Sequence, residues 1–86
     1  MCDYACGLSR SISGKVIPSE RKDHLLIETW NPMGVVGVIT AFNFPHAVFA
    51  WNCCIALVCG NCVVWKGSES TGLVTMATTK ILLNVL

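Results

Sequence analysis

Two short runs of β-branched and apolar residues, separated by a nearly uncharged stretch of helical length, most constrain the fold of this chain. GVVGVIT, residues 34–40, predicts a strand buried on both faces of a parallel sheet, and CVVW, residues 62–65, predicts a second strand. Between them, residues 46–58 predict a helix that is apolar on all sides, with Pro45 in its first turn. Two buried strands joined by a helix predict a right-handed β-α-β unit of an open α/β sheet.

The flanking segments predict a hairpin before this unit and a helix after it. Residues 1–14 are interpreted as the end of a helix that Gly14 terminates. In residues 15–33, the extended pieces 15–18 and 24–30 are separated by a polar turn, which predicts a β-hairpin. The fold class is therefore α/β, with a partial open parallel sheet preceded by a hairpin.

Residues 34–86 are interpreted as two β-α units, the second of which ends in a helix that runs to Leu86. Ser70 or Thr71 is the expected cap of that helix. Charged residues cluster in the segment 15–28, so we expect this segment to meet water. Residues 29–65 carry almost no charge and are expected to be largely covered.

The composition is too apolar for an isolated small domain. The 86 residues are 53% hydrophobic and 13% charged, with a mean hydropathy of +0.61. This favours either a membrane protein or a piece from the interior of a larger fold. The most apolar run, residues 47–65, is interrupted by Asn52 and by the pair at 60–61, which leaves segments too short to span a bilayer. A net charge of +1 without a basic stripe argues against nucleic acid as a partner.

The six cysteines are interpreted as reduced side chains, because the first residues include an acid and lack the apolar stretch of a secretory signal. A cytoplasmic location is expected, with the mitochondrion as the alternative. Cys59 and Cys62 have C-x-x-C spacing, but a single such pair is a weak zinc signal. We expect no metal site and interpret the cysteines as small buried hydrophobes.

Polar residues follow both predicted strands, at the edge where open α/β sheets bind ligands. Asn43 comes just after the first strand and Lys66 directly after the second, so the two loops are expected to face one crevice. Lys66 can donate to ribose hydroxyls or phosphates, and Glu69 can accept from a ribose hydroxyl. The alternatives are that Asn43 caps the helix before Pro45 and that Lys66 is a solvated loop lysine. No G-x-G-x-x-G or P-loop pattern is present.

The residues carry a resemblance to a known enzyme family. GVVGVITAFNFP, followed by AWN-x-x-IAL-x-x-GN-x-VVWKG, resembles the start of the cofactor-binding domain of NAD(P)-dependent aldehyde dehydrogenases. The Phe-Asn-Phe-Pro and Trp-Lys-Gly versions are most similar to family 7, the antiquitins. Segments similar to YACGLSR, IPSER and ETWNPMGVVG also occur in that group, so the resemblance spans essentially the whole chain.

The resemblance implies a reaction and a set of roles. In the family, a catalytic cysteine attacks the aldehyde, hydride passes to the nicotinamide, and the resulting thioester is hydrolysed. The asparagine that Asn43 matches donates its amide N–H to the developing oxyanion. The positions of Thr40, Ala41 and Phe42, together with Asn43, line the cofactor, and Lys66 matches the lysine that binds the adenosine ribose.

Further positions follow from the same resemblance. Glu69 falls where many NAD-preferring members carry a ribose-binding glutamate, which antiquitins often lack, so NAD is expected over NADP. Val48 and Trp51 match positions that line the substrate tunnel. His46 stands where antiquitins usually have an aliphatic residue and is interpreted as a packing variation. Residues 15–33 match part of the oligomerisation region, which implies a homo-oligomer, a tetramer, at full length.

The family's nucleophile and general base lie in Gly-Gln-x-Cys and Glu-Leu-Gly-Gly segments, and neither segment occurs here. The chain is therefore interpreted as a fragment of an NAD-dependent aldehyde dehydrogenase that is inactive alone. By family analogy the substrate is α-aminoadipic semialdehyde. The alternatives are a truncated product that associates with full-length subunits, a small membrane-embedded protein, and a cysteine-based metal module.

Overall fold

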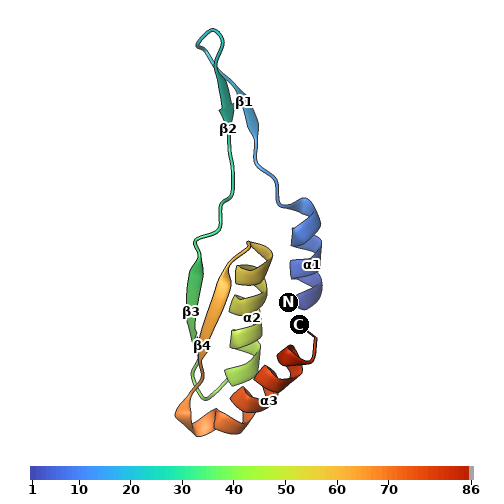
Figure 1. Cartoon of the computed structure of the whole chain (residues 1–86), viewed down its shortest axis with the longest axis vertical. Coiled ribbons are helices and arrows are strands. Elements are labelled where there is room, and N and C mark those ends of the chain that lie inside the picture. Colours follow the sequence, from blue (N-terminus) through green and yellow to red (C-terminus); the bar gives the residue numbers. More distant parts are fainter. Residues whose placement is uncertain (86) are drawn as a thin grey trace.

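The computed structural model describes residues 1–85 as an elongated α/β chain (Figure 1). The elements in order are α1 (Cys2–Ser11), β1 (Val16–Pro18), β2 (Leu25–Ile27), β3 (Val35–Ile39), α2 (Pro45–Val58), β4 (Cys62–Lys66), the 3-10 turn η1 (Glu69–Thr71) and α3 (Gly72–Leu83). This order confirms the predicted succession of helix, hairpin and strand–helix–strand–helix. α3 ends at Leu83, and Asn84 and Val85 form a turn, so the predicted continuation of the helix is wrong for these two residues. Leu86 lies outside the described residues.

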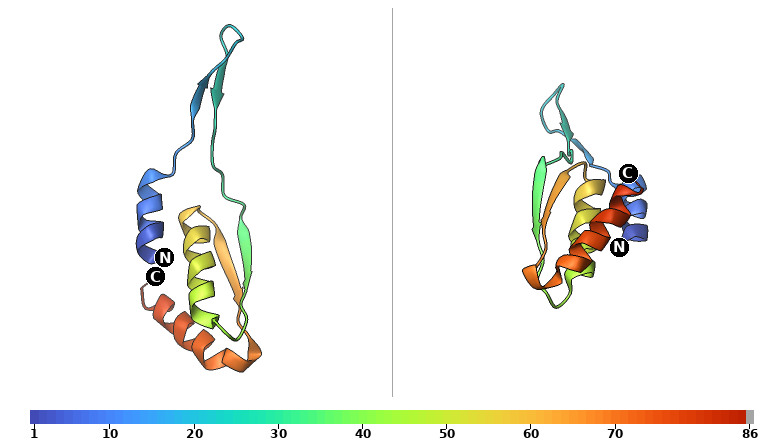
Figure 2. Two further views of the ribbon diagram at one scale, coloured as in Figure 1. Left: turned by 180° about the vertical axis from the view of Figure 1, so that it is seen from behind. Right: turned by 60° about the horizontal axis from the view of Figure 1, so that its bottom comes forward.

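The β1–β2 hairpin forms an arm that projects from the rest of the chain, as both views in Figure 2 show. The two strands pair antiparallel, with Val16 opposite Ile27 and Pro18 opposite Leu25. Both strands are exposed along their whole length, which agrees with the prediction that this segment meets water. β2 covers only three of the seven residues predicted for it, because the paired register ends at Ile27.

Gly14 does not terminate α1 as predicted. The helix ends at Ser11, and Ile12 is already extended, with φ −62° and ψ 115°. Gly14 instead lies against the backbone of Glu28 at the base of the hairpin, where the N–H of Glu28 donates to the carbonyl of Lys15 over 2.9 Å. A Cβ on residue 14 would overlap the carbonyl oxygen of Glu28. The glycine is thus required by the close approach of two chain segments.

Replacing Gly14 with alanine is therefore expected to lower the free energy of unfolding by about 1–3 kcal/mol, because the added methyl group forces the base of the hairpin apart. Gly7→Ala is the matched control. A Cβ at Gly7 meets nothing within 4 Å, and Gly7 lies inside α1, so alanine there is expected to stabilise by about 0.5–1 kcal/mol. Urea denaturation of the two variants checks that the free energy of unfolding falls in Gly14→Ala and rises in Gly7→Ala. Equal changes in the two variants would contradict the role assigned to Gly14.

β3 and β4 pair in parallel, and α2 packs against one face of the pair (Figure 1). Side chains alternate between the two faces: Val38 is only 4% exposed beneath α2, whereas its neighbour Ile39 is 79% exposed. The prediction that this strand is buried on both faces is wrong for residues 1–85. Within them, helices cover only one face of the pair, so its outward side chains remain in water.

α2 buries one stripe of side chains rather than its whole surface. Phe49, Cys53 and Ala56 are buried at spacings of four and three residues, which places them on one helical face. The ring of Phe49 stacks on that of Trp65 in β4, with centroids 3.8 Å apart. Trp51 is 60% exposed, so the predicted burial of this helix on most sides is also wrong.

The predicted burial of the cysteines is wrong for most of them. Of the six cysteines, Cys53 alone is buried and Cys54 is partly buried, while the other four are exposed. The reason is the same one-sided packing of α2 and the β3–β4 pair, which leaves the remaining thiols outside the core.

α3 packs on α2 and adds a further helix to the helical layer. Thr71 occupies the predicted N-cap position, but its hydroxyl donates to the carbonyl of Ser68 instead of accepting from a helix N–H. His46 in α2 is hydrogen-bonded through Nδ1 to Oγ1 of Thr78 in α3, over 3.0 Å. The histidine thus joins the two helices. None of the helices formed by residues 1–85 has the length and apolar character needed to cross a membrane.

Candidate functional site

The carboxyl ends of β3 and β4 are hydrogen-bonded to each other. The candidate site residues lie at these strand ends or in the segments that follow them. Ile39 pairs with Lys66 at the end of the parallel register. One residue further, the N–H of Thr40 donates to the carbonyl of Lys66 over 3.1 Å. The loop that carries Asn43 and the residue Lys66 therefore start from adjacent points of the backbone.

Thr40 is fixed by a second bond that sequence reasoning missed. It is only 3% exposed, and its Oγ1 accepts a hydrogen bond from Nε1 of Trp65 over 3.0 Å. Trp65 is itself held by the stack with Phe49. In the sequence, a tryptophan at the end of an apolar strand indicates only packing. The partner of its indole N–H becomes evident only when the strands pair. The start of the loop is thus anchored at both its backbone and its side chain.

Asn43 lies in the turn between β3 and α2 with its side chain exposed. The alternative that it caps α2 is wrong, because the N-cap is Phe44, with φ −149° and no side-chain cap bond. Ala41 and Phe42 before it and Phe44 after it are exposed as well, so apolar side chains surround the amide in sequence. Among residues 1–85 no hydrogen bond to the Asn43 side chain is recorded, which leaves its N–H groups available to a ligand.

Lys66 and Glu69 are both exposed, at the end of β4 and at the start of η1. An ammonium group and a carboxylate separated by three residues present a donor and an acceptor, which fits the paired hydroxyls of a ribose. The exposure of both side chains is consistent with the prediction that Lys66 and Glu69 bind the adenosine ribose of a dinucleotide. The glycine-rich segment that would cradle its pyrophosphate is not part of this sequence.

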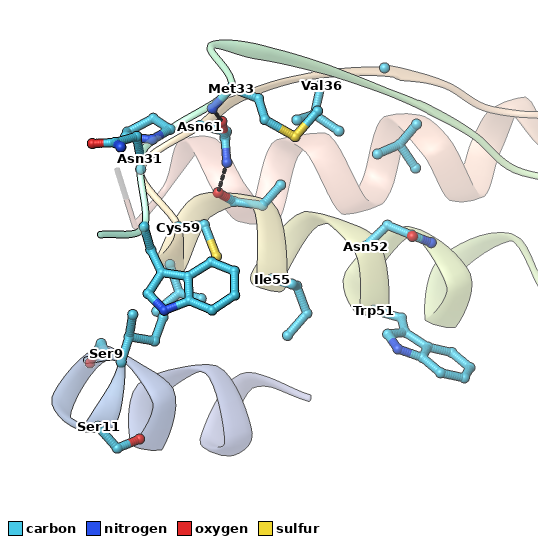
Figure 3. A pocket seen from close by; sticks show the side chains of 18 of the residues that line it. Ser9, Ser11, Asn31, Met33, Val36, Trp51, Asn52, Ile55, Cys59 and Asn61 are labelled. Carbon is cyan, nitrogen blue, oxygen red and sulfur yellow. Dashed lines mark hydrogen bonds between the residues drawn. The ribbon is translucent and has the colours of Figure 1, made fainter. Parts of the chain in front are cut away.

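A groove of about 1300 Å³ lies between α1, the segment 30–39 and α2 (Figure 3). Trp51 lines it, but Val48, the other predicted tunnel residue, does not. None of Thr40 to Asn43, Lys66 or Glu69 lines it either. Residues 1–85 thus bring Thr40 and Lys66, two of the residues predicted to bind the cofactor, together at the strand ends. They do not bring Val48 and Trp51, the two predicted tunnel residues, into one cavity.

Asn61 is a second structural residue that sequence reasoning missed. It is buried at 8% exposure, and its Oδ1 accepts from the backbone N–H groups of Met33, over 2.6 Å, and Gly34, over 3.0 Å. Its Nδ2 donates to the carbonyl of Ala56 over 3.1 Å (Figure 3). This one side chain joins the end of α2 to the start of β3. In the sequence, the Gly-Asn pair at 60–61 indicates only an interruption of an apolar run, and no local pattern points to these partners.

The two cysteines within α2, Cys53 and Cys54, have raised pKa values. Burial raises the pKa of Cys53 above its usual range, with negative charge at Cys2 as a smaller cause. Burial also raises the pKa of Cys54, followed by its hydrogen bond with Cys2. Because the thiolate is the nucleophilic form, raised pKa values disfavour a catalytic role for these two residues. No group of three or more His, Cys, Asp or Glu side chains able to hold a metal ion occurs within residues 1–85.

Comparison with known proteins gives consistent matches over the whole chain. The model of the aldehyde dehydrogenase family matches residues 1–85. The chain is 67% identical to aldehyde dehydrogenase family 7 member A1 of Malus domestica and 66% identical to family 7 member B4 of Arabidopsis thaliana, with 100% of the chain and 17% of each relative covered. It is 59% identical to α-aminoadipic semialdehyde dehydrogenase of Bos taurus, over 100% of the chain and 16% of that protein. The chain thus spans about a sixth of the length of these curated relatives.

Proposed function

Because this chain belongs to the aldehyde dehydrogenase family, we propose that it is part of an NAD-dependent aldehyde dehydrogenase that oxidises an aldehyde to a carboxylic acid. In this proposal the chain supplies the oxyanion donor and the adenosine-side contacts of the active site. The nucleophilic cysteine and the general base come from segments that this sequence does not contain. The 86 residues alone are therefore expected to be inactive.

The observation that carries the proposal is the joined edge of β3 and β4. The Thr40–Lys66 backbone bond and the Trp65–Thr40 side-chain bond hold the start of the Asn43 loop beside Lys66. An enzyme that oxidises an aldehyde with a dinucleotide needs a donor at the reacting carbonyl and contacts for the distant end of the cofactor. Residues from two consecutive loops at one sheet edge meet both needs.

Each residue then has a defined task. Nδ2 of Asn43 donates to the oxygen that becomes negative when the nucleophile adds to the aldehyde. The Lys66 ammonium donates to the adenosine ribose, and the Glu69 carboxylate accepts from a ribose hydroxyl. Thr40, Ala41 and Phe42 lie against the cofactor through the same loop. NAD, when bound, supplies the hydride acceptor.

The substrate and the assembly are inferred from the relatives. Three mammalian relatives are named α-aminoadipic semialdehyde dehydrogenases, which makes this aldehyde the first substrate to test. Val48 and Trp51 are proposed to line its tunnel once further segments enclose α2. The exposed β1–β2 hairpin is proposed to pair with another subunit in a homo-oligomer, a tetramer, because unpaired strand edges favour such contacts.

Glu69→Gln is expected to change the choice of cofactor in the full-length enzyme. The carboxylate repels the 2′-phosphate of NADP, so its neutralisation should raise kcat/KM for NADP relative to NAD by about tenfold. Glu20→Gln, an exposed glutamate in the hairpin turn, is the matched control and should leave the ratio unchanged. Steady-state kinetics with both cofactors checks this. An unchanged ratio in Glu69→Gln would place this carboxylate away from the ribose.

Two measurements test the function as a whole. The native protein that contains this chain should reduce NAD when α-aminoadipic semialdehyde is supplied, as measured by absorbance of NADH. Immunoblotting with an antibody against residues 15–28 should give a band several times larger than 9.3 kDa. A band at 9.3 kDa would favour the alternative function, a truncated product that associates with full-length subunits without catalysing.

A further inference from the structure

Cys2 and Cys54 bring two thiols together from different helices. Cys2 is the first residue of α1, and Cys54 lies within α2, 52 positions later. Their Sγ atoms are 3.8 Å apart. This is the one contact between two cysteine sulfurs recorded within residues 1–85, although Cys53 is adjacent to Cys54 and Cys6 lies one helical turn from Cys2.

The geometry of the pair suits a covalent link. A disulfide requires its sulfurs to approach to about 2.05 Å with a Cβ–Cβ distance of about 3.5–4.5 Å. The Sγ atoms, which are 3.8 Å apart, can approach by rotation of one or both side chains about χ1. α1 and α2 pack on one another along this contact, which keeps the pair from separating.

The two thiols differ in access and in chemistry. Cys2 is exposed and can be reached by a small oxidant, whereas Cys54 is partly buried. Burial raises the pKa of Cys54, and the hydrogen bond with Cys2 raises it further. Because Cys2 is the more exposed of the two, it is the thiol that a dissolved oxidant reaches first, and Cys54 reacts second, with Cys2.

We propose that Cys2 and Cys54 are a site of reversible oxidation that joins α1 to α2 through a disulfide when the protein meets a low-molecular-weight disulfide such as oxidised glutathione. The Cys2 thiol loses its proton, and its sulfur attacks one glutathione sulfur, which breaks the glutathione S–S bond and releases one glutathione thiolate. The Cys54 thiolate then attacks Sγ of Cys2 and releases the second. Two protein thiols are oxidised by two electrons, and the two released thiolates take up the two protons.

The link has a physical consequence that does not depend on the proposed enzyme function. It closes a loop of about fifty residues, which reduces the conformational freedom of the unfolded chain. It also attaches α1 to the helix that follows the Asn43 loop. The oxidised protein should therefore melt several degrees above the reduced protein.

Peptide mapping of the native protein at its natural length tests the site. The protein is treated with oxidised glutathione, its remaining thiols are alkylated, and it is digested with chymotrypsin. Cleavage after Tyr4 separates Cys2 from Cys6, and cleavage after Trp51 and Leu57 isolates residues 52–57, with Cys53 and Cys54, from Cys59 and Cys62. We expect the peptide ending at Tyr4 to be joined to the peptide 52–57 and to be released by dithiothreitol.

Serine variants assign the link to single residues. Cys54→Ser should abolish both the joined peptide and the rise in melting temperature. Cys53→Ser and the exposed control Cys6→Ser should retain both. The proposal is overturned if the wild-type protein leaves the Cys2 peptide fully alkylated after oxidation, or if it joins that peptide to residues 58–65. It is also overturned if Cys54→Ser still forms the link through Cys53.

Discussion

Replacing Asn43 with alanine is expected to lower kcat of the full-length enzyme by about 10²–10³-fold, because the developing oxyanion loses a hydrogen-bond donor in a site that excludes water. The loop itself should persist, since its start is held by the Thr40 bonds and its end by Pro45 in the first turn of α2. KM for NAD should change less than kcat, because Thr40, Ala41 and Phe42 keep their proposed contacts with the cofactor. Steady-state kinetics of NAD reduction measures both parameters.

Asn84→Ala is the matched control for this prediction. Asn84 is also an exposed asparagine, but it follows α3 and is remote in sequence from the strand-end loops. Its replacement should leave kcat unchanged. If Asn43→Ala retained the wild-type kcat, the amide would have no part in the chemistry, and its exposure would reflect a solvated turn only.

Replacing Asn61 with alanine is expected to lower the free energy of unfolding by about 2–4 kcal/mol. The backbone N–H groups of Met33 and Gly34 would lose their acceptor where β3 begins. The carbonyl of Ala56 would retain one partner, the backbone N–H of Asn61, so the larger part of the effect comes from the two donors. Urea denaturation measures the change.

The variant Asn61→Asp distinguishes the bonds that the Asn61 side chain accepts from the bond that it donates. An aspartate keeps an oxygen acceptor for Met33 and Gly34 but places a carboxylate oxygen, in place of the donor, against the carbonyl of Ala56. The stability that it recovers relative to alanine therefore measures the two backbone donors, less the cost of the buried charge. Asn84→Ala serves again as the exposed control, with an expected change within about 0.5 kcal/mol. Equal stability of Asn61→Ala and the wild-type protein would show that water replaces these bonds without cost.

Several local features were predictable from the residues because they depend on nearest neighbours. The β-branched runs predicted β3 and β4, and Pro45 marked the first turn of α2. The polar turn predicted the hairpin at residues 15–33. Parallel pairing followed from the order strand–helix–strand, and with it the expectation that Asn43 and Lys66 leave the same sheet edge.

Burial was not predictable in the same way, because it depends on which other surfaces are present. The run at 34–40 has the composition of a strand covered on both faces, yet Ile39 is exposed because α2 covers one face only. The same limit applies to the cysteines, of which Cys53 alone enters the core. An apolar side chain can be buried at low cost, but the arrangement of the helices and the sheet determines whether anything covers it.

The sequence by itself determined the family, the order of the elements and the edge at which Asn43 and Lys66 lie, because these depend on local patterns and on specific motifs. Only the tertiary structure decided the long-range contacts. It placed Gly14 against Glu28 and Cys2 beside Cys54. It also placed the Asn61 side chain in hydrogen-bond contact with the backbone at the start of β3. Such contacts join residues far apart in the chain, and they form only when packing brings their backbones together, so no local pattern encodes them.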